Sequence, residues 1–176
     1  MNIFKRILNY FDCVTHEIKQ INVKAGLICG IISLILGIVS WVIGGKTANV
    51  SLIFIFPRSA LPLIYAFILW GVSFIFIGFI IGGLLFSCDK FKRQKSYRPL
   101  LFIALMQLVT LCVYPVFFGS LSPFISFILL LIALVFCVFS IISTFKDFPF
   151  WTICLIIHFL WLLYNSYIAL AFAFVN

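Results

Sequence analysis

The side chains that could do chemistry in this chain are few, and most lie in apolar surroundings. The sequence holds 2 His and 4 Asp or Glu among 176 residues. His16 lies in a mixed segment near the start, and His158 lies inside a long apolar run. We expect neither to belong to a metal site or a catalytic pair. The 6 cysteines are scattered without a Cys-x-x-Cys pair, which disfavours a disulfide framework.

His158 begins the densest group of polar and aromatic side chains. Trp161 and Asn165 follow it at i+3 and i+7, so the three share one helix face, and Tyr164 lies beside them. An ionisable group at depth in an apolar run is a functional candidate. A neutral imidazole could equally hold the fold together by hydrogen bonding to a neighbouring helix. Further aromatic or amide side chains that could complete a ligand site are Tyr65, Trp70, Gln107, Tyr114 and Phe118.

Such a set is suited to binding rather than to catalysis. Amides are costly in hydrocarbon and should face the interior of a helix bundle. A flat apolar ligand between helices would find stacking surfaces and a few hydrogen bonds there. Plain helix packing is the alternative, because most of the 23 Phe residues simply face lipid in such a chain. The residues favour a chain that is not an enzyme, and they require no cofactor.

These residues must be positioned by helices that cross a membrane. The chain is 65% hydrophobic, with only 12 Lys or Arg and 4 Asp or Glu, so it cannot cover a soluble surface. The sequence has no charged side chain in 25–45, 59–88, 99–145 or 148–176. A helix needs roughly 20 apolar residues to cross the hydrocarbon core.

The third charge-free stretch is long enough for two crossings and is interrupted by a Gly-Ser-Leu-Ser-Pro turn at 119–123. The sequence therefore predicts an all-α, polytopic membrane protein with a bundle of five transmembrane helices. Four spans remain an alternative if the third stretch re-enters the same face. The predicted spans are 25–45, 61–86, 99–118, 123–145 and 150–174.

Residues 1–24 differ from the rest. Asp12 and Glu17 precede the first apolar run and no Ala-x-Ala site follows it, so we interpret the first span as retained rather than as a signal peptide. Apolar residues recur at helical spacing among Lys, Arg and Gln, which favours an amphipathic, basic helix at the membrane surface. A disordered tail is the alternative.

Lys and Arg indicate the orientation. With the amino terminus inside, cytoplasmic segments hold ten of the 12 basic residues, and the outer segments hold only Lys46 and Arg58. The positive-inside rule then places the amino terminus in the cytoplasm and the carboxyl terminus outside. The net charge of +8 is explained by topology and by attraction to anionic membrane lipid, so we expect no nucleic-acid partner.

Two further patterns concern packing. Gly26-x-x-x-Gly30 and Gly78-x-x-x-Gly82 allow close approach of helix backbones, which could form a homodimer or pack one bundle internally. The apolar stretch before Pro57 precedes a second proline at Pro62, which disfavours one straight helix there. We expect residues 46–60 to fold back as a loop over the outer end of the bundle; an early start of the second span is the alternative.

Three segments resemble the TspO/MBR family, also called translocator protein or tryptophan-rich sensory protein. Residues 57–78 are similar to its Pro-x-Trp-x-Pro-Pro segment, with Pro57, Pro62, Trp70, Gly71 and Gly78 in place. Residues 107–119 are similar to its Gln-Leu…Phe-Phe-Gly segment, one residue shorter. Residues 157–176 are similar to its last helix, with Trp161 matching. The resemblance covers about residues 25–176, in order and at family spacing.

The chain also departs from the family. Ser59 replaces the loop Trp or Phe, and the Asn of the third helix has no clear counterpart. Leu129 stands where the fourth helix usually carries Asp, and Ala169 where the fifth usually carries Asn. Only 4 Trp remain. These departures leave the fold expectation intact and weaken the expectation of tetrapyrrole binding.

The resemblance implies a five-helix fold in a bacterial cytoplasmic membrane, with a pocket that opens toward the first loop. It also implies a receptor, sensor or transporter for a hydrophobic small molecule, with a porphyrin or haem-type ligand as the first expectation. Trp70 and Trp161 would stack on the ligand, and residues 46–60 would form a lid. A non-enzymatic interaction subunit that has lost ligand binding is the alternative, and light-driven porphyrin degradation, proposed for the family, lacks an acid–base pair here.

Overall fold

The computed structural model describes residues 3–44, 55, 57, 60–87 and 90–176. These residues form helices and no strand, and five of the helices are long and apolar enough to cross a membrane. The predicted all-α fold class with five spans is therefore confirmed, and the chain is compatible with an integral membrane protein.

The five long helices lie close to the predicted spans. They are α2 (Val23–Gly44), α4 (Leu63–Leu85), α6 (Tyr97–Tyr114), α7 (Pro123–Thr144) and α8 (Pro149–Val175). A π-helical turn, η2 (Pro115–Gly119), continues α6 to the Gly-Ser-Leu-Ser-Pro turn. Two shorter helices, α1 (Ile3–Lys19) and α5 (Lys90–Lys95), lie outside the spans. Prolines in the first turns of α7 and α8 fit there because the leading N–H groups of a helix have no helical partner.

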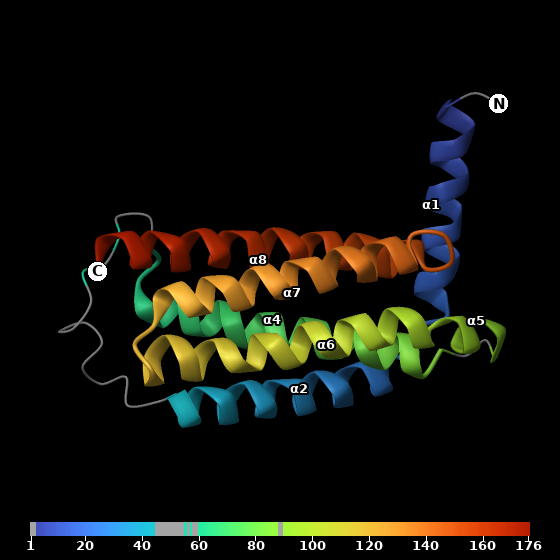
Figure 1. Ribbon diagram of the computed structural model, residues 1–176. Helices are drawn as coiled ribbons and strands as arrows, with labels where there is room; N and C mark the ends of the chain where they lie inside the picture. The colour runs from blue at the N-terminus through green and yellow to red at the C-terminus, as the bar shows by residue number, and fades with distance from the viewer. Residues whose placement is uncertain (1–2, 45–54, 56, 58–59, 88–89) are drawn as a thin grey trace.

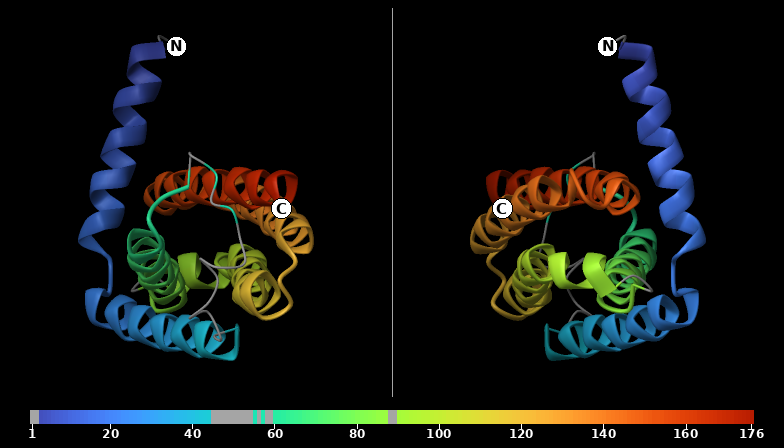
Figure 2. Two further views of the ribbon diagram at one scale, coloured as in Figure 1. Left: turned by 90° about the vertical axis from the view of Figure 1, so that its left-hand side faces the viewer. Right: turned by 90° about the vertical axis from the view of Figure 1, so that its right-hand side faces the viewer.

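The long helices run side by side along one axis (Figure 1). Viewed end-on they form a ring, in which α2 packs on α4, α6 on α7 and α7 on α8 (Figure 2). Contacts between α4 and α8, which close the ring, are sparse. In both figures α1 runs across the bundle axis at one end, the end that also carries α5.

The inner face of α2 consists only of small residues. Those residues are spaced alternately by four and three positions, whereas the large aliphatic side chains of the helix point outward. Helices in lipid associate through close backbone packing at small residues, because there is no hydrophobic force to drive them together. The buried residues of α2 are Gly26, Gly30, Ser33, Gly37, Ser40 and Gly44.

The two Gly-x-x-x-Gly patterns face each other within the bundle. A Cβ at Gly78 would lie 2.7 Å from the Gly30 Cα and would overlap the Cys29 carbonyl oxygen. A Cβ at Gly82 would lie 2.7 Å from the Gly26 Cα. Of the two roles that the sequence left open, the structure uses these glycines to pack α2 on α4.

Polar groups on α2 bind α6. Gln107 Nε2 donates to the hydroxyl of Ser33 at 3.1 Å. The hydroxyl of Ser40 donates to the carbonyl of Leu111. Pro115 has no N–H, so the Leu111 carbonyl lacks its ordinary i+4 helical partner. Ser40 therefore satisfies a carbonyl that the proline leaves open.

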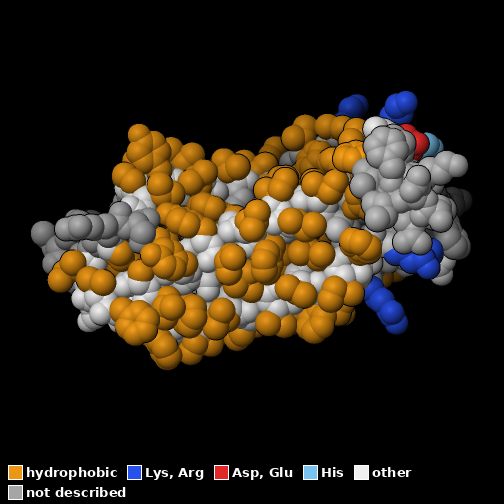
Figure 3. All heavy atoms as spheres, turned by 90° about the horizontal axis from the view of Figure 1, so that it is seen from above, with side chains coloured by type: hydrophobic (Ala, Val, Ile, Leu, Met, Phe, Trp, Pro, Cys, Tyr) orange, Lys and Arg blue, Asp and Glu red, His pale blue; other side chains and the backbone are white. Residues whose placement is uncertain are grey.

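The face of the bundle seen in Figure 3 is apolar along its length, and the described charged side chains on it gather at the end that carries α1. Among the exposed aliphatic residues are Ile28, Ile35 and Val42 on α2 and Ile142 on α7. At the charged end, Lys95 forms a salt bridge with Asp147 at 2.7 Å. This distribution is what a hydrocarbon layer around the bundle requires.

A buried carboxylate joins α1 to the start of α8. Glu17 is 5% exposed, and its Oε2 accepts the backbone N–H of Phe150 at 2.8 Å. A carboxylate at a helix N-terminus is favoured by the helix dipole and by the open N–H groups. Tyr10 adds a second bond by donating its hydroxyl to the carbonyl of Pro149 at 3.2 Å. Burial, and secondly the charge of Glu17, raise the pKa of Tyr10 above 10.0.

Candidate functional site

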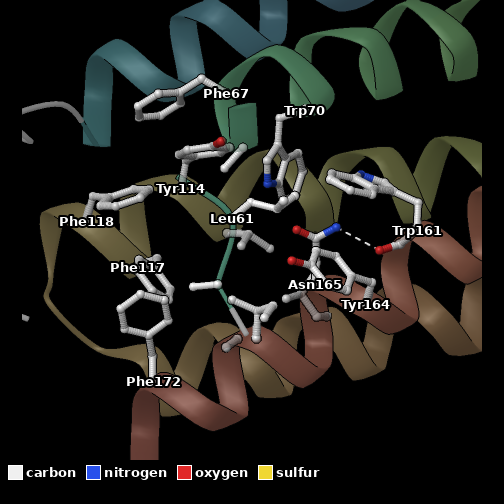
Figure 4. A pocket seen from close by; sticks show the side chains of 16 residues that line it. Leu61, Phe67, Trp70, Tyr114, Phe117, Phe118, Trp161, Tyr164, Asn165 and Phe172 are labelled. Carbon is white, nitrogen blue, oxygen red and sulfur yellow. Dashed lines mark hydrogen bonds between the residues drawn. The ribbon is translucent and has the colours of Figure 1, made fainter. Parts of the chain in front are cut away.

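A cavity lies between α4, α6 and α8, in the half of the bundle away from α1 (Figure 4). It exists because α4 and α8 touch only sparsely, so aromatic side chains rather than close helix contacts fill the space between them. Its volume is about 90 Å³. Six of the predicted site residues line it: Trp70, Tyr114, Phe118, Trp161, Tyr164 and Asn165.

Aromatic rings in mutual contact form the wall on the α4 and α6 side. The Tyr114 ring stacks on that of Phe118 with centroids 5.4 Å apart, and it meets the Trp70 ring edge-on at 5.0 Å. Phe67 stacks on Tyr114 at 5.9 Å. On the opposite side, Trp161 stacks on Tyr164 at 5.8 Å. Such rings present flat apolar faces to whatever occupies the cavity.

The π-helical turn places two consecutive aromatic residues on this wall. In a regular α-helix, neighbouring residues point about 100° apart. In η2, which begins at Pro115, Phe117 and Phe118 both line the cavity, and their ring centroids lie 4.8 Å apart. Phe117 also meets Phe172 of α8 edge-on at 5.3 Å. π-turns recur at functional sites, and here the turn supplies extra aromatic surface to the cavity.

Asn165 provides the amide of the site. Its Nδ2 donates to the carbonyl of Trp161 at 2.7 Å, and the rest of the amide faces the cavity (Figure 4). Among the described residues, the lining holds no Lys, Arg, His, Asp or Glu. Besides Asn165, its polar atoms belong to Trp and Tyr side chains. The described part of the lining can therefore stack on a ligand and hydrogen-bond to it, and none of its side chains is charged.

Three of the predicted site residues do not line this cavity. Tyr65 is 57% exposed on the outer face of α4. Gln107 is buried against Ser33 of α2, two helical turns before Tyr114 along α6. His158 is buried about one turn before Trp161 along α8, and its Nδ1 lies 3.4 Å from the Ser73 hydroxyl. Its Nε2 has no hydrogen-bond partner among the described residues.

Sequence reasoning missed the apolar part of the lining, because no chemistry distinguishes those residues from lipid-facing ones. Their helical spacing relative to the aromatic residues was the available signal: Phe67 precedes Trp70 by three, and Ile168, Ala169 and Phe172 follow Asn165 by three, four and seven. The missed lining residues are Ala60, Leu61, Ala66, Phe67, Val113, Phe117, Leu130, Ile168, Ala169 and Phe172.

The outer end of the cavity is bordered by the chain that leads into α4. Ala60 and Leu61 line it, and Phe172 packs against Ala60 and Phe117. Nearby, the side-chain amide of Asn176 accepts the N–H of Ile55 at 2.7 Å and donates to its carbonyl at 3.1 Å. Most of the predicted lid, residues 46–60, lies outside the described residues, so the lid stays a prediction.

In the arrangement of helices seen in this structure, the cavity is too small for a whole tetrapyrrole. Sites for drug-sized ligands measure roughly 300–1,000 Å³, and a tetrapyrrole is at least drug-sized, whereas this cavity holds about 90 Å³. None of the described lining residues carries a positive charge that could pair with a propionate, and none offers a haem iron an imidazole or a thiolate. Comparisons with family models, curated proteins and solved structures found no match to this chain.

Proposed function

We propose that this chain is a membrane-embedded receptor that binds a flat hydrophobic small molecule between α4, α6 and α8. The observation that carries the proposal is the cavity lined by Trp70 of α4 and Trp161 of α8. A fully packed bundle would place such rings in contact with each other. A cavity walled by indole and phenol rings with one amide has the composition of a small-molecule site.

In this proposal the cavity faces the outer side of the membrane. Ten basic residues lie in α1, α5 and the flanking segments at the opposite end, which by the positive-inside rule is cytoplasmic. The helix α1 then lies in the headgroup layer with its basic residues near anionic lipid. The amino terminus is cytoplasmic and the carboxyl terminus is outside.

The resemblance to the TspO/MBR family supports a sensor or transporter of this kind in a bacterial cytoplasmic membrane. A porphyrin is the ligand that the resemblance suggests first, and it requires α4 and α8 to move apart. Contacts between these two helices are the sparsest in the ring. A smaller single-ring or two-ring compound needs no such movement.

The test is a titration of the purified protein in lipid nanodiscs with naphthalene and, separately, with protoporphyrin. Intrinsic tryptophan fluorescence reports binding, because 2 of the 4 Trp line the cavity. We expect saturable quenching by naphthalene that disappears in the Trp70→Phe plus Trp161→Phe variant. Trp41→Phe serves as the control, because Trp41 lies outside the cavity lining and is exposed on α2.

Quenching that is unchanged in the double variant would place the ligand elsewhere. Absence of saturable binding by either compound would favour the alternative, a membrane interaction subunit without a ligand. In that case the protein should co-purify with another membrane protein.

A further inference from the structure

The orientation of the Asn165 amide determines which atom the cavity presents to a ligand. The Trp161 carbonyl can only accept a hydrogen bond, so the amide group that lies 2.7 Å from it must be the nitrogen. The rotation that would exchange the nitrogen and oxygen is therefore excluded. Asn165 holds its Nδ2 against α8, and its Oδ1 points away from the helix into the cavity (Figure 4).

Within the part of the chain that the structure describes, no group donates to Asn165 Oδ1. The residue lies ten positions before the end of α8, which at 1.5 Å per residue is about 15 Å from that end of the helix. That depth corresponds to the middle of the bilayer, where water is scarce. An amide oxygen there is costly unless a donor reaches it.

The remainder of the lining restricts the ligand further. Its described residues include no acidic or basic side chain, so they supply no counter-charge to a buried ionised ligand. The aromatic walls favour a flat ring, and the volume of about 90 Å³ favours a small one. A pure hydrocarbon would fill the cavity but would leave Asn165 Oδ1 without a partner.

We propose that the ligand class is a small, flat, uncharged ring compound that donates one N–H or O–H to Asn165 Oδ1, as an indole or a phenol does. This inference rests on the proposed function and narrows it. The ring lies between Trp70 and Trp161, and the donor determines its orientation. The Nδ2 bond to the Trp161 carbonyl holds the acceptor in place before the ligand arrives.

The experiment compares three probes of nearly equal shape by equilibrium dialysis: indole, which donates an N–H, and indene and N-methylindole, which do not. Dialysis against protein-containing and empty nanodiscs removes the contribution of lipid partition. We expect indole to bind roughly threefold to tenfold more tightly than either analogue, the effect of one hydrogen bond. Indole carboxylate should bind more weakly than indole.

The Asn165→Leu variant keeps the size of the side chain and removes the acceptor. It should lower the affinity for indole to that for indene and leave the affinity for indene unchanged. Gln107→Leu is the matched control, because it removes a buried amide that does not line the cavity. It should preserve the preference for indole. If the Asn165 variant does not fold, the comparison of indole with its analogues on the wild-type protein still tests the donor assignment.

The outcomes separate the two claims. Equal binding of indole and its analogues, or equal losses for indole and indene in Asn165→Leu, would overturn the donor assignment and leave the receptor proposal standing. Tighter binding of indole carboxylate would likewise overturn the assignment of an uncharged ligand. No saturable binding by any of these probes or by protoporphyrin would overturn both claims.

Discussion

The hydroxyl of Ser40 on α2 donates to the carbonyl of Leu111 on α6, the acceptor that Pro115 leaves without a helical partner. One relationship thus accounts for a buried polar residue on a lipid-embedded helix and for a tolerated proline at the end of a span. It also joins α2 to the end of α6, next to Tyr114 in the aromatic wall of the cavity.

Removing this donor should destabilise the bundle. Ser40→Ala leaves the Leu111 carbonyl unpaired, which we expect to cost about 1–2 kcal/mol. In a Pro115→Ala background the backbone N–H of residue 115 can donate to the Leu111 carbonyl in place of Ser40. The Ser40→Ala substitution should then lower the free energy of unfolding much less. Unfolding in detergent of the two single variants and the double variant measures the coupling. Equal costs of Ser40→Ala in both backgrounds would contradict the relationship.

The glycine pairs provide a prediction about α2. Gly78→Ala places a Cβ against the Cys29 carbonyl and the Gly30 Cα, and the resulting overpacking should cost about 1–3 kcal/mol. Gly71→Ala on the same helix is the matched control, since its nearest neighbour would be 3.5 Å away. It should be neutral or slightly stabilising. Thermal unfolding distinguishes the two variants.

The oligomeric state provides a separate test of the packing role of these glycines. Because they pack α2 on α4, Gly78→Ala should lower stability without changing the mass of the particle measured by light scattering. A shift from dimer to monomer in that variant would instead assign these glycines to a homodimer seam.

The amphipathic helix should loosen in strong alkali. The pKa of Tyr10 is raised above 10.0, chiefly by burial and secondly by Glu17, so the folded state favours the neutral phenol. Its contribution to α1 docking is therefore complete below pH 10.0 and is lost as the pH rises through the higher folded-state pKa. Tyrosinate absorbance, taken as the difference between wild type and Tyr10→Phe, reports that pKa.

Glu17→Gln should lower the Tyr10 pKa part of the way toward its ordinary value, because burial remains after the charge is removed. The variant also weakens the bond to the Phe150 N–H, so hydrogen exchange of α1 should accelerate. An unchanged Tyr10 titration in Glu17→Gln would show that the two side chains do not interact.

The sequence predicted the helices well, because charge-free length reports membrane crossing directly. With η2 counted as part of the third span, the predicted spans and the observed helices end within about two residues of each other, and the longest charge-free stretch does contain two helices. Prediction of the site was less complete. Tyr65 and Trp70 are five residues apart, so at about 100° per residue they point in different directions. That arithmetic alone could have excluded Tyr65 from the cavity.

Gln107 and His158 show a different limit. Each shares a helix face with a cavity residue, Tyr114 and Trp161 respectively, but lies at another depth, where Ser33 or Ser73 of a neighbouring helix meets it. Helical periodicity gives the face of a residue but not the neighbour at each depth. The neighbour depends on how far α2 and α4 slide along the bundle, which local sequence does not encode.

Occupancy of the cavity tests the central claim most directly. Ala66 lines the cavity, and Ala66→Leu should fill part of it; Ala104→Leu on the exposed face of α6 is the control. Native mass spectrometry of protein purified gently in nanodiscs should detect one small-molecule adduct in the wild type and in Ala104→Leu. The adduct should be absent from Ala66→Leu. The same adduct in all three proteins, or in none, would contradict a receptor that binds its ligand between α4, α6 and α8.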